Sequence, residues 1–167
     1  MSYPIYSSKE VKISWAGYDI QGLADGTFVS FEFNSDVFTP RVGADGKISK
    51  SLSPDKTATL TLTLLQESPS NAPLSWALAS AKNGTVIQGA MAITDPSGST
   101  LAFLRGASII SGPTTELGIE AGNKEWTFHV EELDFISAPD NLAEKLSDAD
   151  AAKITAAIGT LSGKIIN

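Results

Sequence analysis

The sequence contains no cysteine and only one histidine, His129, among its 167 residues. Disulfide bonds and thiolate metal sites are therefore excluded, and the redox compartment stays undetermined. A protein metal site usually needs several converging ligands, so a lone histidine at an alternating position is better explained as an ordinary strand residue. We accordingly expect no metal and no cofactor.

Basic residues are also few. Twelve Lys and Arg stand against 19 Asp and Glu, which gives a formal net charge of −7. Tight binding of a nucleic acid depends on Lys and Arg that neutralise phosphates. The charge balance therefore argues against a chain that wraps DNA or RNA, but it allows a wall along which DNA slides without being held.

Long apolar runs are missing. None approaches the roughly 20 residues that a helix needs to cross a bilayer, and residues 1–4 do not begin a basic-then-apolar signal pattern. We expect a soluble protein that is made in the cytoplasm and does not bind a membrane. Its 167 residues are enough for one domain with a core of normal size.

Recognisable catalytic motifs are absent as well. The sequence has no phosphate-binding loop, no dinucleotide fingerprint and no nucleophile elbow, and a serine triad could take its base only from His129. The acidic group Glu131, Glu132 and Asp134 could hold paired carboxylates, but we expect only two of them to share a strand face and Glu132 to point the other way. A solvated strand end explains this group better, so we do not expect an enzyme.

The clearest pattern present is a strict alternation over residues 57–64. Successive side chains of an extended chain point to opposite faces, and threonine is β-branched, so pattern and propensity both predict a strand. One face is apolar: Ala58, Leu60, Leu62 and Leu64. The other carries only hydroxyls, from Thr57, Thr59, Thr61 and Thr63. An ordinary solvent-facing strand would carry charges, so the surroundings of this hydroxyl face are the functional question.

The rest of the chain reads as mostly β. Further alternating segments bounded by turn residues predict strands at 11–15, 18–23, 27–34, 85–94, 100–111 and 125–135. Gly106 is expected to mark a bend or bulge within one of them. Capping residues and Pro73 predict one helix at about 70–82, which Asn83 and Gly84 end. The sum is about seven strands and one flanking helix.

Residues 36–55 predict a long hairpin arm, because Asp45 and Gly46 form a strong hairpin turn signal. We interpret the arm as charged and poor in apolar residues, and therefore as either mobile or ordered by a neighbouring chain. Residues 1–137 are expected to form the β domain. Residues 138–167 are expected to form a helical extension, with a helix at 148–161 whose apolar stripe is Ala151, Ile154, Ile158 and Leu161.

Residues 38–47, 57–71 and 124–128 resemble the tail tube proteins of contractile-tailed bacteriophages, and the resemblance covers about residues 8–136. It implies a tail-tube-type β-barrel or sandwich with one flanking helix. It also implies hexameric rings that stack into a hollow tube in the virion. Such a tube conducts DNA and the tape measure protein, is surrounded by a contractile sheath, and meets baseplate and tail terminator proteins.

The resemblance implies that the arm reaches a neighbouring subunit or ring. Its expected contact residues are Arg41, Val42, Asp45, Gly46, Lys47 and Lys50. An acidic lumen would repel DNA phosphates and allow passage without binding. The candidates for lumen-facing residues are Glu32, Thr59, Thr61, Thr63, Thr127, His129 and Glu131.

A monomeric β-sandwich binding module, for example for carbohydrate, is the alternative. It would expose aromatic side chains on one face, whereas Trp126 and Phe128 alternate with polar residues in the manner of core positions. A small enzyme is a third possibility, which the missing catalytic residues disfavour.

Overall fold

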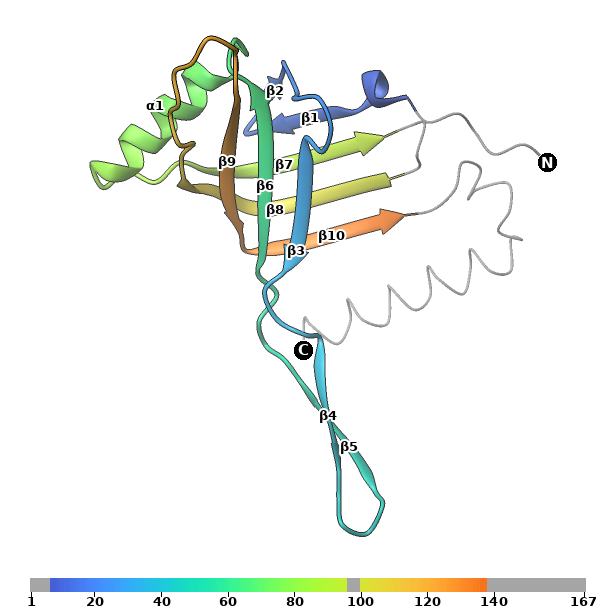
Figure 1. Ribbon diagram of the computed structural model, residues 1–167. Coiled ribbons are helices and arrows are strands. Elements are labelled where there is room, and N and C mark those ends of the chain that lie inside the picture. The colour runs from blue at the N-terminus through green and yellow to red at the C-terminus, as the bar shows by residue number, and fades with distance from the viewer. Residues whose placement is uncertain (1–6, 96–99, 138–167) are drawn as a thin grey trace, which may run out of the picture.

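The structure is a computed structural model that describes residues 7–95 and 100–137 (Figure 1). Within these two ranges the fold is mainly β with one α-helix, as predicted. The elements within these ranges are the 3-10 helix η1 (Ser8–Glu10), β1 (Lys12–Trp15), β2 (Tyr18–Ile20), β3 (Val29–Phe33), β4 (Phe38–Val42), β5 (Ile48–Leu52), β6 (Ala58–Leu65), α1 (Asn71–Lys82), β7 (Gln88–Asp95), β8 (Thr100–Ser111), β9 (Asn123–Val130) and β10 (Glu132–Ser137). The predicted extension at 138–167, with its helix, lies outside the described residues.

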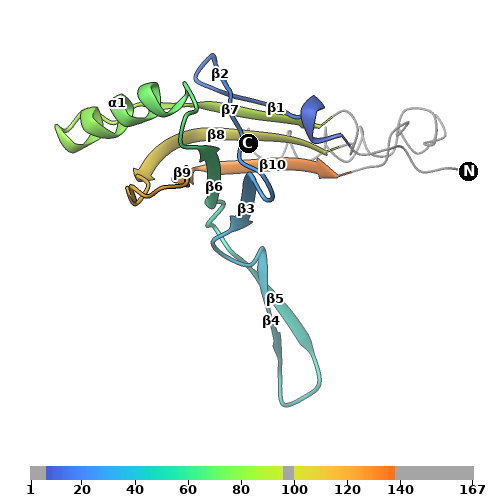
Figure 2. The ribbon, with the colours of Figure 1, turned by 45° about the horizontal axis from the view of Figure 1, so that its top comes forward.

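One antiparallel sheet holds most of these strands, in the order β2-β1-β7-β8-β9-β6-β3, and β10 also pairs with β8. Figures 1 and 2 show that β3, β6 and β9 cross the direction of β7, β8 and β10, so the sheet folds over on itself like an orthogonal sandwich. The named strands at the two ends, β2 and β3, do not pair with each other, although an isolated bridge between Leu23 and Leu64 joins the chain after β2 to β6. A single copy therefore does not close into a complete barrel.

The sheet changes direction at a bend in β8, which lies at Gly106. The φ of this residue is +63°, a value that favours glycine. A Cβ at this position would lie 2.5 Å from the Glu131 carboxylate. Before the bend β8 pairs with β10, and after it β8 pairs with β9. The single strand predicted over 125–135 is therefore wrong: the chain leaves the extended ladder at Glu131 and continues as a second strand in a new direction.

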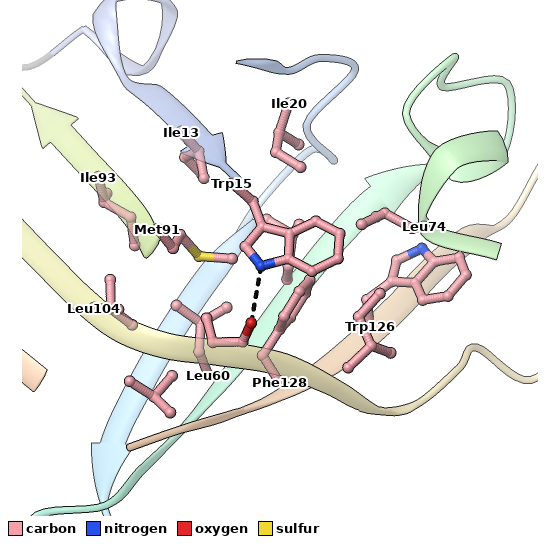
Figure 3. Packing of buried hydrophobic residues seen from close by; sticks show 14 of the residues in the cluster. Ile13, Trp15, Ile20, Leu60, Leu74, Met91, Ile93, Leu104, Trp126 and Phe128 are labelled. Atoms are coloured by element: carbon pink, nitrogen blue, oxygen red, sulfur yellow. Dashed lines mark hydrogen bonds between the residues drawn. The ribbon is translucent and has the colours of Figure 1, made fainter. Parts of the chain in front are cut away.

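The apolar core fills the space between the crossing layers (Figure 3). The even-numbered residues of β6 are buried, as the alternation predicts, and so are Trp126 and Phe128 of β9. The Trp15 ring stands edge-on to Phe128 with 5.4 Å between centroids, and its Nε1 donates to the Ala107 carbonyl oxygen at 3.0 Å. The buried indole nitrogen thus has a partner, which a large polar-tipped aromatic residue needs in a core.

The helix α1 closes one side of this core with Leu74 and Ala77. Ser70 precedes the helix but makes no side-chain cap; its Oγ instead accepts from the backbone N–H of Gln21 at 2.8 Å. Asn71 ties the helix start to the sheet, because it accepts from Trp126 Nε1 at 3.0 Å and donates to the Leu65 carbonyl oxygen at 2.9 Å. Within the described ranges, no helix combines the length and hydrophobicity of a membrane span.

Candidate functional site

The hydroxyl face of β6 is the centre of a polar surface that spans several strands. Thr59 pairs with Glu32 on β3 and with His129 on β9. Thr61 pairs in the same way with Ser30 and Thr127. Directly opposed residues of antiparallel strands share a face, so these side chains all lie on the face opposite to the core. We call this surface the polar face; it consists of Ser30, Glu32, Thr59, Thr61, Thr63, Glu125, Thr127 and His129.

The polar face extends beyond the residues that the sequence singled out. His129 pairs with Ser108 on β8, which in turn pairs with Gln88 on β7. A row of polar side chains therefore crosses five strands, from Gln88 to Glu32. Alternation of Ser108 with the buried Ala107 and Ile109 could have revealed its face, but the pairing to His129 requires the three-dimensional register.

Glu131 lies differently from the other candidates, because it occupies the turn between β9 and β10. Its backbone N–H donates to the Arg105 carbonyl oxygen at 3.1 Å, and its carboxylate accepts from Gln88 Nε2 at 2.6 Å. The structure thus places Glu131 at the margin of the polar face, with its carboxylate held by an amide at the end of the polar row.

No Lys or Arg belongs to the polar face of β3, β6 and β9. Its charged members are Glu32 and Glu125, with Glu131 at the margin and His129 as the one titratable base. A surface of hydroxyls and carboxylates stays hydrated, and it lacks the cations that hold nucleic-acid phosphates. Chemically, this face suits contact with water and weak repulsion of anions.

Glu132 and Asp134, the other two members of the acidic group considered above, form a surface ion cluster rather than a catalytic pair. Glu132 and Asp134 both lie beside Arg105, at 3.1 Å and 3.7 Å, and Glu132 also contacts Lys56 Nζ at 3.4 Å. The prediction that Glu132 points away from Asp134 is wrong, because the two residues are two positions apart on β10 and side chains at that spacing share a strand face. Among the described residues, no group of three or more His, Cys, Asp and Glu is arranged to hold a metal ion.

The predicted arm protrudes from the body as a separate two-stranded sheet of β4 and β5 (Figures 1 and 2). The expected contact residues of the arm are all exposed on it: Arg41, Val42, Asp45, Gly46, Lys47 and Lys50. Gly46 takes a φ of +78° in the turn, and the Lys47 carbonyl oxygen accepts from the Gly43 N–H at 2.8 Å. The strands also sort their side chains by polarity. Phe38 pairs with Leu52, and Val42 with Ile48.

These four apolar side chains share one face of the arm, which also carries Pro40 and Lys50, while Thr39, Arg41, Ser49 and Ser51 lie on the other. The interpretation of the arm as poor in apolar residues is therefore incomplete, because its apolar residues are concentrated on one face. Val42 is 71% exposed and Leu52 80% exposed. An apolar face of this kind is costly to leave in water, and such faces mark interaction sites.

The arm root, residues 34–37 and 53–57, joins this ribbon to the body through side-chain bonds. Ser35 Oγ donates to Asp55 Oδ2 at 2.5 Å, and the Thr57 N–H donates to Asp55 Oδ1 at 3.0 Å. Asn34 donates from Nδ2 to Thr57 Oγ1 at 2.8 Å and accepts from Thr59 Oγ1 at 2.7 Å. The bonds from Ser35 and Thr57 lower the pKa of Asp55 to about 2, so its carboxylate is charged at neutral pH.

Trp126 and Phe128 do not form an exposed platform for a sugar ring. Trp126 and Phe128 are 1% and 0% exposed, as their alternation predicted. Trp76 on α1 is 68% exposed, but α1 packs on the apolar side of the sheet and Trp76 has no ring contact among the described residues. The carbohydrate-binding alternative therefore gains no support from Trp126 and Phe128. The exposed aromatic pair on the described sheet is Phe33 and Phe135, each 46% exposed, with ring centroids 6.1 Å apart.

Solved structures with a similar fold come from contractile injection systems. The cap that terminates the tube of the anti-feeding prophage has a TM-score of 0.61 at 12% identity, over 83% of this chain and 94% of that one. The sheath/tube terminator of the PVC extracellular contractile injection system gives 0.60 at 13%, over 82% and 99%. A chain of the PVC sheath–tube complex gives 0.58 at 14%, over 82% and 93%. At these identities the likeness shows the fold.

Family membership comes from the sequence itself. No curated protein sequence matches the chain significantly. One family model, described as the bacteriophage PhiTE tail tube protein, matches residues 10–137 and so includes β1 to β10, the polar face and the arm. With the matching fold and more than half of its length covered, the chain belongs to the PhiTE tail tube protein family.

Proposed function

We propose that six copies of this chain form a ring and that the rings stack into a hollow tube, with the polar face lining the lumen. The observation that carries the proposal is the open sheet: in the part of the chain that the structure describes, β2 and β3 each pair with one strand only, and an uncovered strand edge is a template for another chain. Joining copies through these edges would leave few strand edges exposed.

The arm supplies the second contact in this proposal. Its exposed apolar face, formed by Phe38, Val42, Ile48 and Leu52, is covered when it docks against another copy. The burial of apolar area then favours assembly by roughly 25 cal/mol per Å². The expectation from the sequence that the arm acts between subunits or rings is retained here as part of the proposal.

The lumen would carry DNA without binding it. Each chain has a formal charge of −7, and the polar face of β3, β6 and β9 contains no Lys or Arg. Phosphates are therefore repelled rather than held. The tape measure protein would occupy the lumen before DNA passes. A contractile sheath would surround the tube, and baseplate and terminator proteins would meet its two ends, in keeping with the sheath and terminator named for the similar structures.

Negative-stain electron microscopy of the purified full-length chain tests the proposal directly. Rings or stacked tubes with a central channel are the expected result. A protein that remains a small monomer over a wide concentration range would contradict the proposed assembly. A matched test compares the wild type with a deletion of residues 43–50 from the arm, which should fold but no longer stack.

A further inference from the structure

The arm leaves the body through a short stretch that has few main-chain ladder bonds. The ladder of the large sheet ends where Phe33 pairs with Ala58, and the ladder of the arm begins where Phe38 pairs with Leu52. Between them the backbone contributes one bond from the Asn34 N–H to the Thr57 carbonyl oxygen, at 3.1 Å, and one from the Ser53 N–H to the Val37 carbonyl oxygen, at 2.9 Å.

Side chains supply most of the connections at this point. Asn34 and Ser35 belong to the outgoing limb of the arm root, and Asp55 and Thr57 to the returning limb. We call these four residues the clasp. Within it, Asp55 uses both carboxylate oxygens: one accepts from Ser35 across the root, and the other accepts from the Thr57 N–H in its own limb. Hydrogen bonds to a charged acceptor are stronger and more directional than neutral ones.

A second tie fixes the returning limb to the body. Lys56 follows Asp55 directly and its Nζ contacts Glu132 on β10 at 3.4 Å, while Glu132 is held in turn by Arg105 on β8 at 3.1 Å. The adjacent residues Asp55 and Lys56 thus contact different parts of the molecule: Asp55 contacts the outgoing limb, and Lys56 contacts the large sheet. A limb held on two sides has little freedom to swing.

We propose that Asp55 is a positioning residue, which acts through the clasp to hold the arm in one direction before a second copy docks against it. The inference rests on the proposed function, since the partner of the arm is another copy of this chain. Preorganisation matters here because a freely swinging arm would lose its conformational freedom on docking, and that loss weakens association.

The direction of the arm can be measured in the monomer. The chain has no cysteine, so Ala44→Cys at the arm turn and Ala79→Cys on α1 give two unique spin-label positions. Electron–electron double resonance is then measured at a protein concentration too low for assembly. The distances between the two spin labels should form one narrow distribution. Adding Asp55→Ala should roughly double the width of the distribution, because local restraint is lost.

The matched control is Asp36→Ala, which removes an exposed carboxylate from the same root without touching a hydrogen bond of the clasp. Its distribution should keep the wild-type width. Circular dichroism checks that each variant is folded. If Asp55→Ala does not fold, Ser35→Ala tests the same bond from the donor side, with Ser51→Ala on the polar face of the arm as its control.

Assembly provides the second measurement. The concentration at which half of the chain forms tubes should rise about tenfold for Asp55→Ala and stay unchanged for Asp36→Ala. A wild-type distribution that is already broad, or an Asp55→Ala distribution as narrow as the wild type, would overturn the proposal. A narrow wild-type distribution in a protein that never forms rings would instead overturn the proposed function and leave the clasp standing.

Discussion

Phe128 lies at the centre of the core, with an exposed fraction of 0% and the Trp15 ring against it. Replacing it with alanine removes these contacts and leaves a cavity that the crossing sheet layers cannot fill. We expect Phe128→Ala to lower the free energy of unfolding of the monomer by about 3–5 kcal/mol. Denaturant unfolding measures this, and Trp76→Ala at the exposed surface of α1 should change the value by less than about 0.5 kcal/mol.

Asp55 makes stability depend on pH in a defined direction. Its pKa falls from 3.8 to about 2 on folding, chiefly through the bond from Ser35. A carboxyl with a lowered folded-state pKa stabilises the fold above its unfolded pKa, and this contribution disappears as the pH falls towards about 2. The stability difference between wild type and Asp55→Asn should therefore be constant above about pH 5 and shrink between pH 4 and pH 2. A difference that grows on acidification would show that the carboxylate does not have this role.

Glu32 tests the electrostatic part of the lumen assignment. The variant Glu32→Lys puts a cation into the polar row, so assembled tubes should retain short duplex DNA at low salt and release it as salt is raised. Filter retention of labelled DNA measures this effect. The control is Glu67→Lys, which makes the same charge change at an exposed position before α1 and away from the polar face. Equal retention of DNA by both variants would contradict the assignment of Glu32 to the lumen.

Among the elements, β6 was predicted most completely from the sequence. Strict alternation over residues 57–64 defines both of its faces, because the two-residue period of a strand is a local property. The break at Glu131 was missed, although the alternation changes phase there, from apolar residues at 126, 128 and 130 to apolar residues at 133 and 135. The new direction of the chain could not be predicted in this way, because it depends on the packing of Glu131 over Gly106, 25 positions earlier in the chain. Gly106 itself was correctly predicted as a bend.

The arm was also predicted only in part from the sequence. The Asp45–Gly46 turn signal predicts a hairpin, but the apolar face appears only when the register pairs Val42 with Ile48 and Phe38 with Leu52. The polar row has a similar origin, since Gln88 and Ser108 reach His129 only through pairing between strands distant in the sequence. The local sequence pattern thus identified the strands and their two faces. Which residues of other strands lie beside each face could be seen only in the three-dimensional structure.

The two faces of the arm should respond differently to charge. The double variant Val42→Asp, Ile48→Asp places carboxylates on the apolar face, and tubes should no longer form because docking would bury these charges. The double variant Thr39→Asp, Ser51→Asp makes the same charge change at another directly paired position, on the polar face, and should still assemble. Electron microscopy compares the two. Loss of tubes in both would mean that the arm responds to charge alone and not to which face carries it.

At the scale of the molecule, the family match confirms the resemblance carried by residues 38–47, 57–71 and 124–128. The chain is a structural tail tube protein and a component of the virion, and the expectation that it is not an enzyme is confirmed by the family to which it belongs. The absence of recognisable catalytic motifs had led to the same expectation that the chain is not an enzyme.

Assembly should make the stability of the chain depend on its concentration. Neighbouring copies that bind the folded chain and not the unfolded one raise its apparent stability by mass action. The thermal unfolding midpoint of the wild type should therefore rise as the protein concentration is increased. The midpoint of the variant Val42→Asp, Ile48→Asp should rise less with concentration than that of the wild type, because this variant keeps the strand-edge contacts and loses only the arm contact. A wild-type midpoint that does not move with concentration would contradict assembly through folded copies.

The arm leaves the body at one end only, and this gives any filament built through it a polarity. A contact between an arm and a different surface of the next copy is heterologous, so it can be repeated indefinitely and has no internal stopping point. One terminus of such a filament would present free arms and the other would present unoccupied receiving surfaces. Two chemically different caps would then be needed, and the length would have to be set by something other than the subunit itself.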